Sequence, residues 1–289
     1  MLRGSDSYRA RRPWPRATQS APDRTRTLPA TCAGHLRHEE PALPPEKSVT
    51  AENRLLAALP PAERRRFLAG CEQVGLAFTQ VLVEPGDSVR HVYFPTTGSV
   101  SLVMPIEGHA GLEVGLIGDE GMLGSSLALG VQVAALRAIV QGGGFALRMK
   151  AVPFQRELLE CPALQDLMKR HVQALMWQIA QTAACTRFHT LEARLARRLL
   201  MSQDRAHSGG FHVTHEFLAR MLGVRRVGVT RAATLLQDRG MIRYSRGDVT
   251  IVDRAGLEAA SCGCYRACKE IYARTLGRCR RLPASRDAG

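Results

Sequence analysis

Two kinds of hydrophobic pattern fill most of the chain. Over Phe78–Lys150, short runs of Val, Ile, Leu and Phe alternate with Gly, Pro and Asp. Over Pro162–Arg205, apolar residues recur every three or four positions. The first pattern is typical of the short strands of a β-barrel or jelly roll, and the second of helices. Ahead of both, the helical spacing of Glu52–Gly70 is interrupted at Pro60 and Pro61, which predicts two short helices.

The strand pattern predicts a barrel-like domain over residues 49–160. The segments between its turns are too short for the crossover helices that parallel strands need, so a parallel α/β sheet is disfavoured. The expected strands are Val81–Val83, Val89–Phe94, Val100–Met104, Leu112–Ile117, Leu136–Val140 and Phe145–Met149.

The helical pattern predicts a long helix over residues 161–188, with a break near Arg187–Thr190 and a second helix beyond it. Its apolar stripe is wider than one buried face requires, so we expect one face on the barrel and another against a second copy of the chain. A single core helix in a monomer is the alternative. The residues expected on the dimer helix contact are Met168, Val172, Leu175 and Ile179.

A helix-turn-helix pattern follows within residues 189–260. Thr214 is suited to cap the first helix, and Gly223 lies where a tight turn requires a residue that tolerates positive φ. A second helix is expected over Arg225–Arg239, with its apolar residues on one face. The opposite face carries Arg226, Val227, Thr230, Arg231 and Thr234.

That opposite face has the side chains that reading a DNA major groove requires. Arginine can donate two parallel hydrogen bonds to guanine, and small Thr and Val side chains allow contact with thymine methyl groups. The runs Met241–Tyr244 and Val249–Val252 flank a turn sequence and predict a β-hairpin, the wing of a winged helix-turn-helix. A helical hairpin with a solvated arginine face is the alternative.

Charge is concentrated in the C-terminal third. The net charge is +14; residues 188–289 carry 19 Lys and Arg against 9 Asp and Glu, whereas residues 49–187 carry 12 of each kind. Such a balance favours a polyanion partner, and nucleic acid is the first candidate because phosphate neutralisation releases counterions. A solvated basic surface would give the same count. Residues 1–48 lack periodicity and are expected to be a disordered extension.

Four segments resemble the Crp/Fnr family of bacterial transcription regulators. VTHEFLARMLGVRRVGVTRAATLLQDRGMIRY is similar to its winged helix-turn-helix, and QTAACTRFHTLEARLARRLLMSQDR to the junction between its dimer helix and DNA-binding domain. VLVEPGDSVRHVYFPTTGSVSLV and EVGLIGDEGMLG are similar to its effector domain. The resemblance covers about residues 50–258.

The resemblance implies an α+β protein with a double-stranded β-helix (jelly-roll) effector domain, a long dimerisation helix and a C-terminal winged helix-turn-helix. It implies a regulator rather than an enzyme, which binds an inverted repeat of double-stranded DNA as a homodimer. RNA polymerase and a small-molecule effector are the further partners that it implies.

Carried onto this sequence, the family's base-reading positions fall on Arg226, Val227 and Arg231. Arg225 lies where a Ser or Thr commonly contacts phosphate, and Thr214 matches a position that contacts the DNA backbone. The family's usual Glu at the middle base-reading position is Val227 here, so the resemblance implies a different operator sequence.

The effector site departs further from the family pattern. Cyclic-nucleotide binders have Gly-Glu-Leu for the ribose and Arg-Ser for the cyclic phosphate, whereas this chain has Gly121-Met122-Leu123 and Arg137-Ala138. The missing carboxylate and hydroxyl argue against cyclic AMP and leave the effector unidentified. Gly121 and Arg137 are the candidate effector-binding residues, although an arginine on the barrel rim needs no ligand.

Cysteine spacing gives no strong metal motif. The family's oxygen sensors hold an iron–sulfur cluster through closely spaced N-terminal cysteines, and Cys32 is alone in that region. Near the other end, Cys262, Cys264, Cys268 and Cys279 match no strong template, so no metal is expected there. Residues 261–289 are expected to be a Cys- and Arg-rich tail. The cysteines are expected to be reduced, in a cytoplasmic protein.

Two other classes of function fit the sequence less well. A metal-dependent barrel enzyme would need a His-x-His pair and a carboxylate, whereas the chain has His91 and, distant from it, His109 with Glu113. A barrel that binds a small molecule without operator specificity is the remaining form of that alternative. An RNA-binding protein would need aromatic stacking residues, and aromatics are only 5% of the chain. No apolar run reaches the roughly 18 residues of a membrane span, so no membrane partner is expected.

Overall fold

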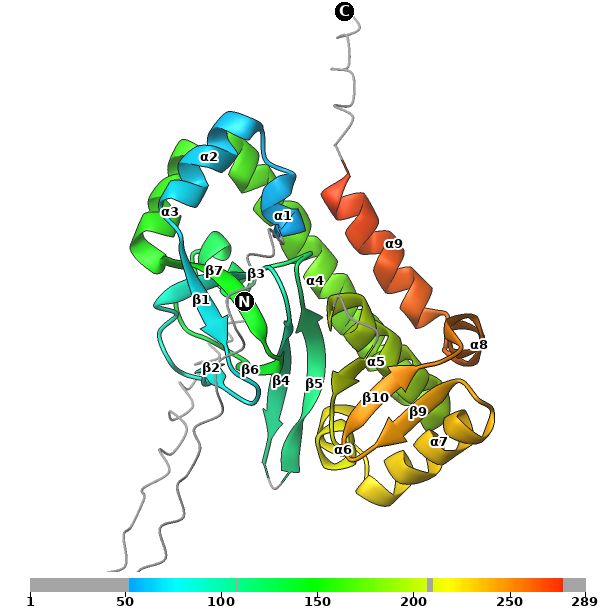
Figure 1. Ribbon diagram of the computed structural model, residues 1–289. Coiled ribbons are helices and arrows are strands. Elements are labelled where there is room, and N and C mark those ends of the chain that lie inside the picture. The colour runs from blue at the N-terminus through cyan, green and yellow to red at the C-terminus, as the bar shows by residue number, and fades with distance from the viewer. Residues whose placement is uncertain (1–51, 108, 207–209, 278–289) are drawn as a thin grey trace, which may run out of the picture. The chain divides into compact units, whose positions relative to one another are not determined.

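The computed structural model describes residues 52–107, 109–206 and 210–277, so the extension expected over residues 1–48 lies outside the described residues. The first part of the described chain is rich in strands, with helices gathered at one end (Figure 1). Its elements are α1 Arg54–Ala57, α2 Pro61–Ala69, β1 Glu72–Leu76, β2 Val81–Val83, β3 His91–Pro95, β4 Ser99–Ile106, β5 His109–Ile117, the 3-10 helix η1 Ser125–Leu129, β6 Arg137–Gly142, β7 Gly144–Lys150 and α3 Ala151–Glu160.

Two antiparallel sheets form the expected jelly roll, with strand orders β1-β7-β3 and β2-β6-β4-β5. Their interior is apolar, and Phe94, Val100 and Val140 are completely buried. The six predicted strands are confirmed as β2 to β7. Strand β1 was not predicted, because its residues are mostly exposed and only Val74 and Leu76 are large and apolar.

Helices α1 and α2 are the two short helices that the break at Pro60 and Pro61 predicted, and Pro61 is the first residue of α2. They close one end of the jelly roll together with α3. Phe67 of α2 packs edge to face on Phe94 and Phe154, with ring centroids 5.4 and 6.3 Å apart. This aromatic cluster joins the helices to the sheet core, because each ring is completely or almost completely buried.

The second part of the chain is mainly helical, with one small sheet of order β8-β10-β9. The predicted break between two long helices is confirmed at residues 189–190. The elements are α4 Pro162–Phe188, α5 Leu191–Ala206, β8 Gly210–His212, α6 His215–Leu222, α7 Arg226–Asp238, β9 Ile242–Ser245, β10 Asp248–Ile251, α8 Arg254–Ala260 and α9 Cys264–Leu276.

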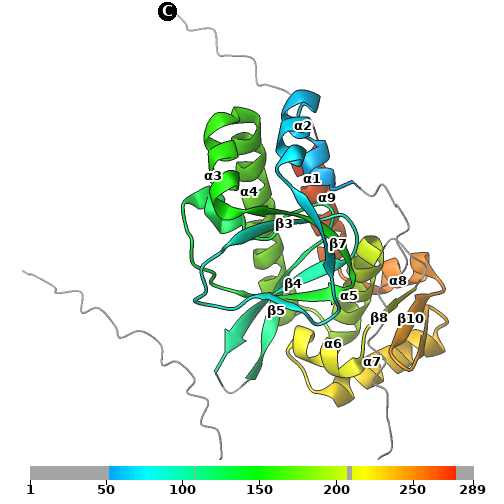
Figure 2. The same ribbon diagram turned by 60° about the vertical axis from the view of Figure 1, so that its left-hand side comes forward.

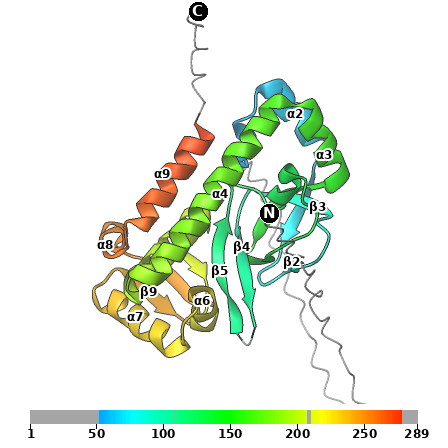
Figure 3. The same ribbon diagram turned by 180° about the vertical axis from the view of Figure 1, so that it is seen from behind.

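Helix α4 has three different faces: one on the jelly roll, one beside α9, and one exposed among the described residues (Figure 3). Two of the predicted dimer-contact residues face the chain's own barrel, since Met168 is 1% exposed in its core and Leu175 packs against the sheet core. Val172 and Ile179 are half-buried. The exposed residues between these faces are Gln173, Met176, Trp177, Ala180, Ala183 and Ala184.

The helix-turn-helix and wing are built as predicted, with α6 and α7 joined at Gly223, whose φ is +64°. The core beneath them contains Leu199 of α5, Leu218 of α6 and Leu236 of α7, each at most 1% exposed. Strand β8 was not predicted, because it is three residues long and takes its structure from pairing with β10.

The C-terminal segment is not a tail over its described length. Helix α9 lies along α4 (Figures 1 and 3), and Arg170 of α4 donates a hydrogen bond to the Gly277 carbonyl oxygen at 3.2 Å. The apolar spacing of its buried residues explains this packing, because Cys264, Cys268 and Tyr272 recur every four positions. Within the described residues, no helix is both long and apolar enough to cross a membrane.

Candidate nucleic-acid interface and barrel cavity

Helix α7 separates an apolar face from a basic one. Val229, Ala232, Ala233 and Leu236 are buried against the rest of the domain. The opposite face is exposed to solvent over about one and a half helical turns. Even the apolar Val227 is 64% exposed there. The predicted residues that lie on this exposed face are Arg225, Arg226, Val227, Thr230 and Arg231.

The N-terminal end of α7 is fixed by contacts from α6. His215 Nδ1 lies 3.1 Å from the Thr230 hydroxyl, and its ring stacks on Tyr244 of the wing with centroids 4.2 Å apart. Burial lowers the pKa of His215, and the charge of Arg226 lowers it further, so the imidazole is neutral at pH 7. These contacts hold the exposed face of α7 in one orientation relative to the wing.

Thr214 is exposed and caps α6 as predicted. Its hydroxyl oxygen accepts a hydrogen bond from the Phe217 backbone N–H at 3.1 Å. This is a structural role for the side chain. It leaves the free N–H groups of the first turn of α6 at the same surface, where backbone donors suit a phosphate oxygen.

The wing is a tight hairpin whose two-residue loop is Arg246-Gly247, with φ values of +52° and +94°. Positive φ at both loop residues matches the twist of a two-residue hairpin. Arg243 and Arg246 are exposed on this hairpin and add cations to the surface that α7 presents. The prediction of DNA-contacting residues omitted both, although the arginine at the tip of the predicted turn was visible in the sequence.

Comparisons with known proteins agree on this architecture. The family model described as the Crp-like helix-turn-helix domain matches residues 193–260. The structure of FixK2 from Bradyrhizobium japonicum has a TM-score of 0.56 at 14% identity, covering 66% of this chain and 98% of that one. A putative transcriptional regulator of the Crp/Fnr family from Eubacterium rectale has a TM-score of 0.56 at 16% identity, covering 72% and 99%.

A third structure, the c-di-GMP responsive global regulator CLP of Xanthomonas campestris, has a TM-score of 0.53 at 18% identity, covering 66% of this chain and 98% of that one. No curated protein sequence matches the chain. The chain has the Crp/Fnr fold and a Crp-like helix-turn-helix domain. The family model describes a helix-turn-helix domain, and two of these similar structures are of transcriptional or global regulators.

The jelly roll of this Crp/Fnr fold forms an open cavity of about 430 Å³, which Leu175 of α4 helps to line. Apolar side chains such as Leu102, Ile117 and Met122 line part of it, and Leu175 of α4 lines another part. Arg90 and Ser126 belong to its polar lining. A cavity of this size with a few polar groups is suited to a small molecule.

The two predicted effector-binding residues do not line this cavity. Arg137 forms a salt bridge with Glu84 at 2.8 Å, and both side chains are more than 40% exposed. A Cβ atom at Gly121 would lie 2.9 Å from the His171 ring, so the glycine is explained by packing against α4. Met122, which stands where the resemblance implies a Glu in cyclic-nucleotide binders, does line the cavity.

Two buried ion pairs join the jelly roll to the first helix of the Crp-like domain. Arg198 of α5 lies 2.8 Å from Glu113 of β5, and Arg205 lies 2.5 Å from Glu120. All four side chains are less than 10% exposed. Losing one member of such a pair leaves an unpaired buried charge, which typically costs about 3–5 kcal/mol.

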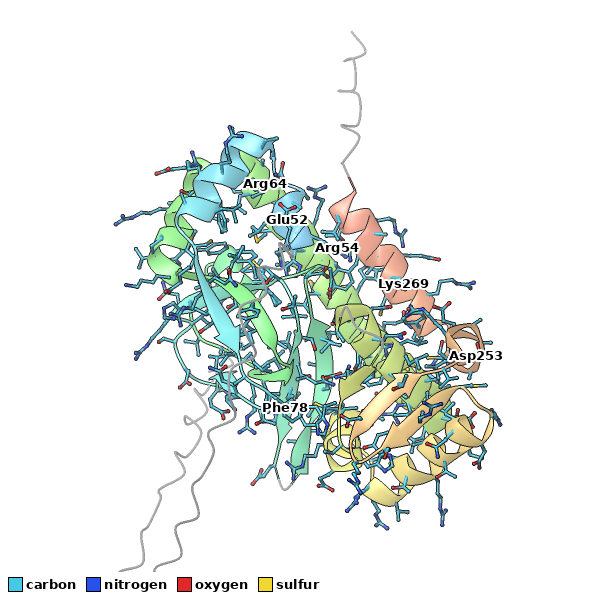
Figure 4. All side chains as sticks on the ribbon, in the orientation of Figure 1. Glu52, Arg54, Arg64, Phe78, Asp253 and Lys269 are labelled. Carbon is cyan, nitrogen blue, oxygen red and sulfur yellow. The ribbon has the colours of Figure 1, made fainter. Side chains whose placement is uncertain are left out.

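Aromatic packing at the same boundary adds to these ion pairs. Phe78, at the edge of the jelly roll (Figure 4), lies 5.9 Å from the ring centroids of both His212 and Phe217. Helix α6 lies beside the β4–β5 pair, with α7 on its far side (Figure 2). A Cβ atom at Gly223 would come within 2.9 Å of Leu112 on β5. The helix-turn-helix therefore contacts the jelly roll directly.

The structure separates the four C-terminal cysteines that were considered as metal ligands. Cys262 and Cys264 lie beside Cys185 and His189 at the end of α4, whereas Cys268 faces Arg197 with a sulfur–nitrogen distance of 3.6 Å. Cys279 lies outside the described residues. Hydrogen bonding to Cys262 lowers the pKa of Cys185, and His189 and Arg197 act in the same direction.

Proposed function

We propose that this protein is a homodimeric, sequence-specific DNA-binding regulator that reads an inverted-repeat operator through α7 and responds to a small molecule in the jelly-roll cavity. The observation that carries the proposal is the exposed face of α7. Arg226 and Arg231 lie about one turn and a half apart on it, with Val227 between them. Arginine spacing of this kind suits guanine edges in the major groove, and Val227 suits a thymine methyl group.

Phosphate contacts would fix the protein on the duplex around these base contacts. Arg225 precedes α7, and Arg246 extends from the wing tip, so cations flank the base-reading face on two sides. The N-terminus of α6 supplies backbone donors at Thr214. An inverted repeat is expected because a two-fold symmetric dimer presents two α7 helices in opposite senses.

The dimer would form along the exposed face of α4. Met176 and Trp177 expose 61% and 51% of their surfaces there, next to small alanines that permit close approach of a second helix. This face replaces the one that the sequence pattern predicted, because the chain's own barrel already occupies Met168 and Leu175.

A ligand in the cavity would act on α4 through Leu175, and on α5 through the ion pairs that join the jelly roll to it. Met122 replaces the Glu of cyclic-nucleotide binders, which favours an effector other than cyclic AMP. RNA polymerase is a further partner in this proposal, since a regulator on DNA acts on transcription through the polymerase.

Selection of binding sites from random DNA tests the proposal, with the full chain and with a panel of cyclic mononucleotides and cyclic dinucleotides, including c-di-GMP. The wild type should enrich an inverted repeat, and an effector should change the enrichment. Arg231→Ala should relax the base preference at one position of each half-site. It should also weaken the affinity for the operator by about 1–3 kcal/mol, roughly 5- to 150-fold.

Arg266→Ala is the matched control, because it removes the same charge from an exposed site on α9, outside the helix-turn-helix. It should enrich the wild-type repeat. Enrichment of an unchanged repeat with unchanged affinity by Arg231→Ala would remove Arg231 from the base-reading set.

A further inference from the structure

Four potential metal ligands converge at the junction of α4, α5 and the α8–α9 connection. They are Cys185 and His189 at the end of α4, and Cys262 and Cys264 at the start of α9. Their ligand atoms all lie within 4.8 Å of one another. The three cysteines are buried, and His189 is exposed.

Two pairs of these ligand atoms have the spacing expected around a single metal ion. Cys185 Sγ lies 3.5 Å from Cys262 Sγ, and Cys264 Sγ lies 3.4 Å from His189 Nδ1. In a tetrahedral zinc site, bond lengths of about 2.3 Å to sulfur and 2.0–2.1 Å to nitrogen separate two sulfurs by about 3.8 Å and a sulfur from a nitrogen by about 3.6 Å. The observed contacts already approach these values.

Packing alone does not account for the arrangement. Buried cysteines often serve as small apolar residues, and Cys185, Cys262 and Cys264 do share an apolar contact with Ala193. A purely apolar role, however, requires neither a histidine nitrogen nor an amide directed at sulfur. The Gln181 side-chain N–H donates to Cys264 Sγ at 2.9 Å, which is the kind of hydrogen bond that supports a metal-bound thiolate.

We propose that Cys185, His189, Cys262 and Cys264 form a Cys₃His site for one Zn²⁺ ion. Three thiolates and one imidazole are a common donor set for structural zinc. Exposed His189 would give the ion a path from solvent. A four-iron cluster fits less well, since its thiolates bind different irons and are therefore spread further apart than these sulfurs.

The bound ion would link α8 and α9 to the junction between α4 and α5. Cys185 and Cys262 are 77 positions apart, so the ion closes a long loop between the end of α4 and the end of the helix-turn-helix domain. It would also fix residues 189–190, where α4 gives way to α5. Neither consequence depends on the DNA-binding proposal.

Elemental analysis of the full chain, purified under reducing conditions without chelator, tests the site first. About one zinc per chain is expected in the wild type. Titration of the metal-free protein with Co²⁺ should then give the intense visible absorption of tetrahedral thiolate coordination. Added Zn²⁺ should raise the melting temperature of the metal-free protein, because binding energy at such a site stabilises the folded state.

Two ligand variants and a matched control complete the experiment. Cys262→Ser and His189→Ala should each weaken Zn²⁺ binding at least tenfold, and His189→Ala is informative even if Cys262→Ser misfolds, because His189 is exposed. Cys268→Ser is the control, since Cys268 lies one turn beyond Cys264 on α9 and is buried but outside the ligand set. It should bind zinc like the wild type.

Five results would overturn the proposal, the first four of which concern metal binding. These four are the absence of zinc and cobalt binding, equal binding by His189→Ala and the wild type, loss of binding in Cys268→Ser, and isolation with iron and acid-labile sulfide. A Cys185–Cys262 disulfide in the reduced preparation, without metal, would also overturn it.

Discussion

His171 is a completely buried histidine on the barrel-facing side of α4, next to Gly121. Burial lowers its pKa to about 4, and the carboxylate of Glu120 opposes this shift. The folded state therefore binds a proton less readily than the unfolded chain, in which histidine titrates near 6.5. Stability from the neutral ring is complete above about pH 6.5 and is lost as the pH falls towards 4.

Replacing His171 by Leu should flatten this dependence. Between pH 7.5 and 4.5, the wild type should lose about 2–3 kcal/mol more of its free energy of unfolding than His171→Leu, measured by urea unfolding at each pH. The two proteins differ only at position 171, so the comparison isolates the contribution of that side chain. Parallel curves for the two proteins would show that His171 is protonated at little cost in the folded state.

Single residues differ in how far the sequence could predict them. The exposed positions of Arg226, Val227 and Arg231 follow from helical periodicity, which is a local property, and the structure confirms that exposure. Their contacts with DNA stay a prediction. Gly121 could not be assigned from sequence, because its reason is a contact with His171, fifty positions away in the chain and visible only in the fold.

For helix α4, the sequence predicts the element itself but not the contacts that its faces make. Its ends, its length and the break before α5 follow from Pro162 and the apolar period. Its apolar stripe, however, is used twice within the chain, by the jelly roll and by α9. Periodicity alone cannot show which part of a wide stripe remains free, so two of the four predicted contact residues, Met168 and Leu175, fall on the barrel side.

A charged substitution on the exposed face of α4 tests whether this helix forms the proposed dimer contact. Met176→Glu should dissociate the proposed dimer, weakening it by about 2 kcal/mol or more, roughly 30-fold in Kd, because the carboxylate would be buried without a partner. Mass measurement by light scattering across a concentration series would show this. Val152→Glu is the control, since Val152 of α3 is exposed to a similar extent at 58%. A monomeric wild type at all concentrations, or equal behaviour of both variants, would refute dimerisation through this face.

The sequence could not predict which residues make up the proposed cysteine site, because they come from different helices. The C-x-C spacing of Cys262 and Cys264 was visible, but their neighbours Cys185 and His189 belong to a different helix. The sequence instead grouped them with Cys268 and Cys279. Proximity in the chain was therefore a poor guide to the ligand set, because α9 folds back along α4.

At the scale of the whole molecule, short packed routes in the described part of the chain connect the cavity to α7, the helix that we propose reads DNA. Leu175 joins the cavity to α4, and the pairs of Arg198 with Glu113 and Arg205 with Glu120 join the jelly roll to α5. Helix α6 also packs on β5, so in the proposed regulation a change in the jelly roll is passed directly to the helix-turn-helix. The spacing between two α7 helices is thus the quantity that an effector would adjust.

The most direct test of the account is the dependence of DNA affinity on half-site spacing. The dissociation constant is measured for the selected inverted repeat, and for the same half-sites with about five base pairs inserted, half a helical turn. The account predicts a loss of at least about tenfold on insertion, since the two α7 helices can no longer enter the same side of the duplex. Equal affinity for both duplexes would contradict it.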